Sequence, residues 1–191
     1  LKRYAEVGNV DVPVPSYRGF HVRPATLIAK IVRHYGSDIR MELDGQIYDA
    51  GSPMDIFRAN EKINAWKRRW LVAEIERIPP PRGNLNESQI RAAVLHVVLK
   101  LAQEGKIILY QQPLQLSNEF SHDGILLEKV TAEIARLQAT GQIDIRADLS
   151  IRFTGDQRVL DDLELLAQSG YGEDRFGNNT TLPRELAYLR R

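Results

Sequence analysis

The sequence contains no cysteine among its 191 residues. This absence excludes disulfides, zinc–thiolate sites and thiol nucleophiles, and it fits a reducing compartment. No apolar run approaches the ~20 residues that a helix needs to span a bilayer, and no signal peptide is visible. We therefore expect a cytoplasmic protein without membrane insertion.

An excess of charge of one sign is also lacking, because 26 basic residues face 25 acidic ones. Nucleic-acid binding requires clustered positive charge, so we expect no nucleic-acid partner. The one basic run, Lys67-Arg68-Arg69, reads as a solvated edge beside Trp66 and Trp70. No glycine-rich phosphate loop or nucleophile elbow is present, and His122 beside Asp123 has no further ligands for a metal. We expect neither a metal nor a cofactor.

What the chain does have is a normal apolar fraction of 43%, enough to build a core. Alternation over residues 10–14 predicts a strand. The apolar spacing of residues 24–35 predicts a helix that ends at Gly36. Residues 38–43 and 46–49 predict two strands joined by the Asp44-Gly45 turn.

The next two helices have recognisable starts. Ser52, with Pro53 and Asp55 after it, predicts a helix start with a capping box, and this helix should run towards Ile63. Residues 70–78 alternate and are predicted as a strand, although they could also extend the helix. Asn86 and Gln89 predict a second capping box, for a helix that ends near residue 104.

The remainder is less regular, and no internal repeat is apparent. Residues 107–116 look partly extended, and residues 125–140 look helical. Residues 142–153 alternate as one long strand or as a hairpin bent near Asp148, and Thr154 with Gln157 should cap a last helix. Residues 170–183 are rich in glycine and asparagine and read as a mobile loop. We predict an α+β protein with a β-α-β-β-α-β-α domain over residues 1–106 and an accessory α+β region over residues 107–191.

One motif carries chemistry: Gly19-Phe20-His21-Val22-Arg23-Pro24-Ala25, at the junction of the first strand and the first helix. The first turn of a helix presents unpaired N–H groups and favours negative charge. Pro24 loses nothing there by lacking an N–H. Neutral imidazole is nucleophilic near pH 7, and Arg18 and Arg23 add positive charge. His21 is therefore the candidate phosphoryl acceptor.

This heptapeptide resembles the phosphorylation-site motif of the histidine-containing phosphocarrier protein (HPr) family. The resemblance extends through Thr26–Lys30, the Asp44-Gly45 turn and Ala50–Met54, and covers roughly residues 10–105. It implies an open-faced β-sandwich and phosphorylation of His21 by a phosphoenolpyruvate-dependent enzyme I-type donor. Arg23 would stabilise the phosphohistidine, in an environment to which Arg18, Pro24 and Ala25 belong. The phosphoryl group would pass to an enzyme II-type or regulatory acceptor, in sugar transport or in regulation.

Some family members are also phosphorylated at the serine that corresponds to Ser52, although capping alone explains this residue. Three functions stay open at this point. The first is a stoichiometric phosphocarrier, the second is a regulatory or protein-binding module that no longer relays phosphate, and the third is an enzyme with a site in the accessory region. An exposed His21 ring supports the carrier, whereas a His21 covered by the accessory region supports the module.

Overall fold

The computed structural model describes residues 6–190, which form two compact units. Unit 1 takes the described residues up to Ile63 together with those from Asp148 onward, and unit 2 is Asn64–Ala147. Unit 1 contains β1 (Val7–Pro13), α1 (Val22–Tyr35), β2 (Arg40–Leu43), β3 (Gln46–Asp49), the first part of α2 (Pro53–Glu76), β6 (Ser150–Asp156), α5 (Gln157–Gln168) and the 3-10 helices η1 (Gly170–Gly172) and η2 (Arg184–Arg190).

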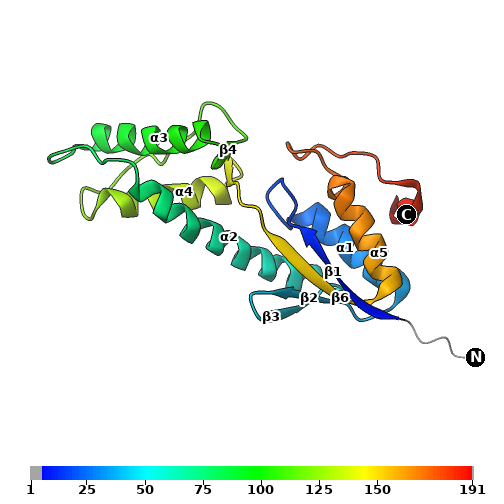
Figure 1. The fold of residues 1–191 in the computed structure, drawn as a ribbon. Helices are drawn as coiled ribbons and strands as arrows, with labels where there is room; N and C mark the ends of the chain where they lie inside the picture. The colour runs from blue at the N-terminus through cyan, green and yellow to red at the C-terminus, as the bar shows by residue number, and fades with distance from the viewer. Residues whose placement is uncertain (1–5, 191) are drawn as a thin grey trace, which may run out of the picture. The chain divides into compact units, whose positions relative to one another are not determined.

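The sheet of unit 1 has four antiparallel strands in the order β1-β6-β2-β3 (Figure 1). Phe153 of β6 pairs with Val10 on one side and with Met41 on the other. One face of the sheet is buried under helices and carries Val12, Met41 and Phe153, each at most 2% exposed. On the other face, Arg152 forms an ion pair with Asp11 at 2.9 Å, and both side chains are about half exposed. The sheet is therefore open on one side.

The position of β6 corrects the predicted division of the chain at residue 106. The elements of unit 1 follow one another as β-α-β-β-α-β-α. The last strand and helix of this order are β6 and α5, however, and not residues 70–78 and 86–104. Because β6 lies between β1 and β2 in the sheet, the described residues from Asp148 onward belong to unit 1. The residues that separate them from Ile63 form a unit of their own.

Residues 70–78 are not the predicted strand, because α2 includes residues 70–76 and ends at Glu76. Leu71 and Ile75 are buried in the core of unit 2, together with Ile78 just beyond the helix. Positions 71 and 75 share the parity of a strand and also the i, i+4 spacing of a helix. Alternation alone could not separate the two structures.

The capping residues at the helix starts agree with the prediction, with two differences. Asn86 and Gln89 form the predicted capping box, and Ser52 Oγ accepts a hydrogen bond from the Asp55 N–H at 3.3 Å. The Asp55 carboxylate reaches the N–H of Asp49, at 2.9 Å, rather than that of Ser52. The predicted cap of the last helix at Thr154 is wrong. Thr154 belongs to β6, and Asp156 caps α5 by accepting from the Arg158 N–H at 3.0 Å.

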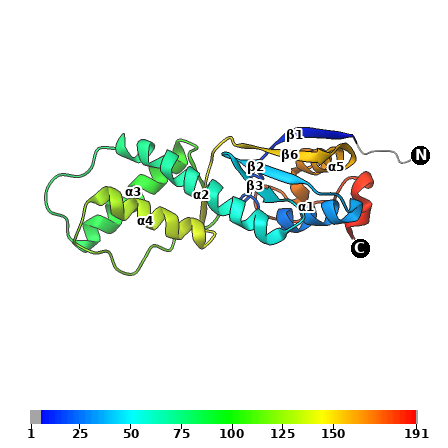
Figure 2. The same cartoon turned by 90° about the horizontal axis from the view of Figure 1, so that it is seen from below.

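Unit 2 consists of the second part of α2, α3 (Glu87–Gln103), β4 (Ile107–Leu109), α4 (Leu126–Ala139) and β5 (Ile143–Ile145); Figure 2 shows α3 and α4 with the end of α2. Its helices α3 and α4 are each followed by the same kind of turn. Each of α3 and α4 ends before a left-handed glycine, Gly105 or Gly141, and each glycine leads into a strand. The two strands pair antiparallel about Ile108 and Asp144. The order helix, left-handed glycine, strand therefore occurs twice in unit 2, in two segments that share few identical residues.

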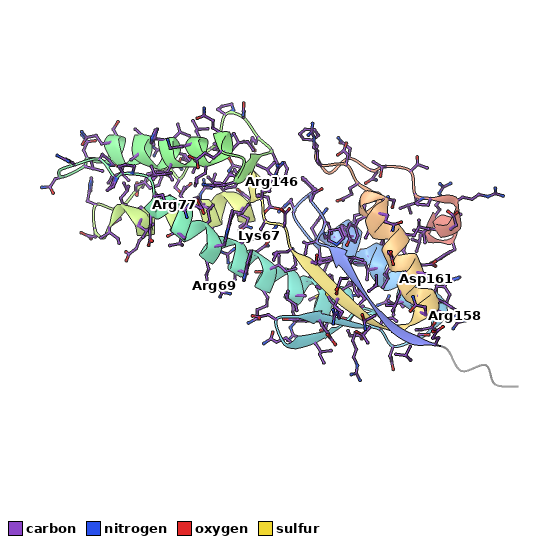
Figure 3. The ribbon with its side chains drawn as sticks, in the orientation of Figure 1. Lys67, Arg69, Arg77, Arg146, Arg158 and Asp161 are labelled. Atoms are coloured by element: carbon purple, nitrogen blue, oxygen red, sulfur yellow. The ribbon has the colours of Figure 1, made fainter. Side chains whose placement is uncertain are left out.

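The basic run in unit 2 is not simply a solvated edge. Lys67 is 4% exposed, and its Nζ lies 3.4 Å from a carboxylate oxygen of Asp144, which is 2% exposed (Figure 3 labels Lys67). The other Asp144 oxygen accepts from Gln138 at 3.2 Å. A charge can be buried when it is paired and hydrogen-bonded in this way, so Lys67 belongs to the interior of unit 2.

A chain that ends at residue 106 should fail to fold, because its sheet lacks β6 and leaves β1 unpaired. A chain in which a flexible Gly-Ser linker replaces residues 64–147 should keep the four-stranded sheet. Circular dichroism and the dispersion of amide NMR signals distinguish the two shortened proteins. A well-folded 1–106 chain would contradict the assignment of β6 to this sheet.

Replacing Asp156 by Asn should destabilise the protein at neutral pH. The Arg158 side chain hydrogen-bonds the Asp156 carboxylate and, with the Arg158 N–H and Ser37, lowers its pKa to about 2. An unfolded Asp has a pKa of about 4. A depressed pKa stabilises the folded state above the unfolded value, and the effect is lost as pH falls through the folded one.

The stability gap between wild type and Asp156→Asn should therefore be largest above pH 4 and should close towards pH 2. Urea denaturation across this range measures the gap. Asp161→Asn is the matched control, because Asp161 is an exposed aspartate of α5 (Figure 3) and its carboxylate accepts a hydrogen bond from the Gln157 side chain at 2.8 Å. A gap for Asp156→Asn that does not depend on pH would contradict this account.

Candidate functional site

His21 is the N-cap residue of α1, with an extended backbone (φ −77°, ψ −166°). In the described part of the chain, no side chain caps this helix, and its first turn holds no acidic residue. The starts of α3 and α5 differ, since Asn86 and Asp156 satisfy N–H groups there. The N-terminus of α1 therefore keeps the partial positive charge that an anion would meet.

The backbone of the first turn can be followed group by group. Ala25 donates its N–H to the carbonyl oxygen of His21 at 3.0 Å, and Pro24 has no N–H to offer. Both residues are buried, so they support the turn by packing. The N–H groups of Val22 and Arg23, which have no acceptor inside the helix, are those an added anion could use.

The loop before His21 is held by Asn60 of α2, a residue that the sequence analysis did not select. Its Oδ1 accepts from the Phe20 N–H at 3.0 Å, and its Nδ2 donates to the Arg18 carbonyl at 3.3 Å. Arg18 and Gly19 both have left-handed backbones, with φ of 56° and 64°. The available signal was a buried asparagine among Ile56, Ala59 and Ile63 on the apolar face of α2.

The segment that follows α5 supplies a hydrogen-bonding side-chain partner of His21. Nε2 of His21 lies 2.7 Å from Oε2 of Glu173. Arg23 donates from its Nε to the carbonyl oxygen of Gly172 at 3.0 Å. The Tyr17 ring meets the His21 ring edge-on, with 5.1 Å between their centroids. Residues separated by about 150 positions in sequence thus form one site.

This segment is a hydrogen-bonded turn and not the loose loop that its composition predicts. The Asp174 side chain accepts from the N–H groups of Phe176 and Asn178, both at 2.9 Å, and the turn lowers its pKa. Thr180 donates its N–H to Gly172 at 2.9 Å. Tyr171, which is 3% exposed, donates its hydroxyl to Pro13 of β1, and burial raises its pKa. Glu173 is thereby held in place from both sides.

The side chains of His21 and Glu173 differ in their exposure to solvent. The His21 side chain is 22% exposed and that of Glu173 is 5% exposed. The ring can be reached from solvent, but one of its nitrogens is engaged by a carboxylate. Arg23 is half-buried, and only its Nε is hydrogen-bonded to protein in the described residues, so the terminal guanidinium nitrogens can face an added anion.

The structure brings together most of the residues predicted for the site. His21, Arg23, Pro24 and Ala25 lie in one turn, and Arg18 enters the adjoining loop through its backbone. Ser52 lies at the start of α2, where its N–H donates to the Asp49 carbonyl and its carbonyl and hydroxyl oxygens accept from the N–H groups of Ile56 and Asp55. Among the residues that the structure describes, no hydrogen bond joins Ser52 to His21.

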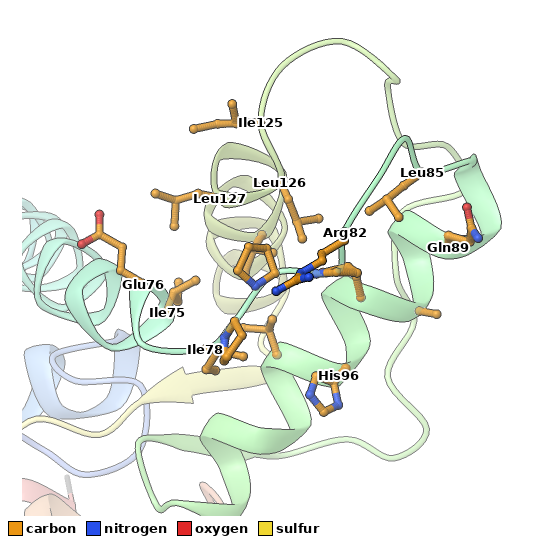
Figure 4. Close-up of a pocket in the computed structure, with 17 residues that line it drawn as sticks. Ile75, Glu76, Ile78, Arg82, Leu85, Gln89, His96, Ile125, Leu126 and Leu127 are labelled. Atoms are coloured by element: carbon orange, nitrogen blue, oxygen red, sulfur yellow. The ribbon is translucent and has the colours of Figure 1, made fainter.

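Unit 2 has a separate pocket of about 820 Å³ (Figure 4). Its walls come from the end of α2, the triple-proline loop, α3 and the start of α4. They are mainly apolar, with a few polar side chains: Glu76, Arg82, Gln89 and His96.

No group of histidine and carboxylate side chains suited to a metal is found within residues 6–190. No helix of this part is long and apolar enough to cross a membrane.

Comparison with protein families gives one match. Residues 9–62 match the family described as "PTS HPr component phosphorylation site", where PTS is the phosphotransferase system. This confirms the predicted resemblance over the N-terminal part of the chain. The match ends before Asn64, where unit 2 begins, and so falls short of the predicted limit at residue 105. Comparisons with curated proteins and with solved structures give no match.

Replacing Gly19 by Ala should destabilise unit 1 by more than replacing Gly45. A Cβ at Gly19 would lie 2.4 Å from Oδ1 of Asn60, whereas a Cβ at Gly45 meets nothing within 4 Å. Both glycines have positive φ, a cost of about 1–2 kcal/mol for alanine. The excess in Gly19→Ala therefore reports the Asn60 contact, and urea denaturation of the two variants measures it.

Asn60→Ala should cost about 1–3 kcal/mol, because it leaves the Phe20 N–H buried without its acceptor. In the double variant with Gly19→Ala, the two losses should not add, since both act on the same loop. Fully additive effects would show that Asn60 does not hold the loop.

Proposed function

We propose that the protein is a phosphocarrier in which His21 accepts a phosphoryl group from a phosphoenolpyruvate-dependent, enzyme I-type donor. His21 then passes the group to an enzyme II-type or regulatory protein acceptor. The observation that carries the proposal is the position of His21. It is a partly exposed imidazole at the uncapped N-terminus of α1, within the segment that matches the phosphorylation-site family.

In this proposal, the residues around His21 have separate tasks. The N–H groups of Val22 and Arg23 hydrogen-bond the phosphoryl oxygens, aided by the helix dipole. The terminal guanidinium nitrogens of Arg23 balance their charge, and Arg18 adds positive charge to the surroundings. Pro24 and Ala25 keep the turn in shape. The protein acts stoichiometrically, needs no metal or cofactor, and works in the cytoplasm, in the transport or the regulatory branch of the system.

Ser52 is the candidate for a second, regulatory phosphorylation. It caps α2, and a phosphate at a helix N-terminus is stabilised by the helix dipole. The carboxylate of Asp55 stands in the same turn, where it would repel a phosphate. Capping therefore remains the simpler role for this serine.

A second function is favoured by one specific observation. The C-terminal segment contacts both His21 and Arg23, as expected for a regulatory or protein-binding module whose histidine no longer relays phosphate. The two functions differ in one measurable property, which is whether His21 takes up phosphate.

Incubation with phosphoenolpyruvate and an enzyme I preparation from the same cells should place acid-labile phosphate on the wild-type protein. His21→Ala should abolish the label, because it removes the imidazole that the proposal makes the phosphoryl acceptor. His122→Ala, which changes an exposed histidine of unit 2, should label like wild type. A wild-type protein that stays unlabelled with its cognate donor would overturn the carrier function and favour the module.

A further inference from the structure

We infer that Glu173 is the positioning residue of His21: its carboxylate fixes the proton on Nε2 and so makes Nδ1 the ring nitrogen that accepts the phosphoryl group. This inference rests on the proposed function for its consequence. The contact itself can be tested without any phosphoryl donor.

The assignment of the proton follows from what a carboxylate can do. An ionised carboxylate only accepts hydrogen bonds, and its Oε2 lies 2.7 Å from Nε2 of His21. Nε2 must therefore carry the hydrogen. In a neutral imidazole the other nitrogen then has the free lone pair. Nδ1 is bonded to the ring carbon that carries Cβ, so it is the ring nitrogen closer to the backbone of His21, the N-cap residue of α1.

Glu173 is held in place before any reaction. Its side chain is 5% exposed, and its own N–H donates to the Gly170 carbonyl at 3.2 Å. Its backbone also forms a bridge with Asn179. On the other side of the site, Arg23 ties Gly172 to α1. A carboxylate fixed in this way selects one tautomer, as the partners of catalytic and metal-binding histidines do.

The Glu173 carboxylate also stabilises the positive charge that develops on the His21 ring when the phosphoryl group is transferred to it. The Nδ1 lone pair attacks the phosphorus of a phosphohistidine donor, and the donor's P–N bond breaks with its electron pair returning to the donor imidazole. His21 keeps its Nε2 proton and becomes a phosphorylated imidazolium. The positive ring then lies against the negative carboxylate of Glu173, which stabilises the product and the transition state that leads to it.

Nitrogen-15 NMR of the His21 ring, at a pH where the ring is neutral, tests the tautomer. The wild type should show a protonated Nε2, an unprotonated Nδ1 and a downfield Nε2 proton that exchanges slowly with water. Glu173→Gln and Glu173→Ala should show a mixture of tautomers and a rapidly exchanging proton. Glu185→Gln is the matched control, since Glu185 is an exposed glutamate of the same C-terminal segment, and it should match the wild type.

Phosphoryl uptake from the donor gives the second readout. We expect uptake by both Glu173 variants to be about tenfold slower, in line with the loss of an orienting partner. Ring signals unchanged from wild type in both variants would overturn the inference, even if uptake were slower. Altered ring signals in a protein whose wild type takes up no phosphate would support the role of Glu173 and refute the phosphocarrier function.

Discussion

The antiparallel pairing of β6 with both β1 and β2 is the constraint on which the site depends. A strand between two neighbours satisfies its backbone groups on both edges, and here the neighbours precede it by more than 100 residues. Because β6 lies in the sheet of unit 1, α5 and the residues after it, which follow β6 in the chain, also belong to unit 1. Glu173 reaches His21 only as a consequence of this pairing.

The site combines a helix N-terminus that can bind an anion with a carboxylate that contacts the His21 ring. The N-terminus of α1 is left without a side-chain cap and without an acidic residue, which favours a guest anion. A carboxylate is present, yet it reaches the site at Nε2 of the ring. An acidic side chain in the first helical turn would occupy the place that the proposed phosphoryl group would take. A carboxylate on Nε2 orients the ring and leaves its other nitrogen free.

Two polar residues that look unremarkable in the sequence hold this arrangement together. Asn60 fixes the backbone of residues 18–20, and Asp174 folds the turn that follows Glu173. Each satisfies backbone groups of a loop that has no regular partner. The loops around His21 are therefore held by side chains from α2 and from the C-terminal turn.

The sequence by itself determined the local features: the His21 motif, the helix that ends at Gly36, the Asp44-Gly45 hairpin and the Asn86 capping box. These depend on contacts within a few residues, such as caps, turns and one helical stripe. Only the tertiary structure decided which strand completes the sheet, where the two units divide and that Glu173 meets His21. Strand pairing joins distant segments through backbone hydrogen bonds, which any sequence can form, so alternation at residues 70–78 and at residues 143–153 could not reveal the partner of either segment. Positions 71 and 75 fit a helix as well as a strand, and burial in the core of unit 2 decided between them.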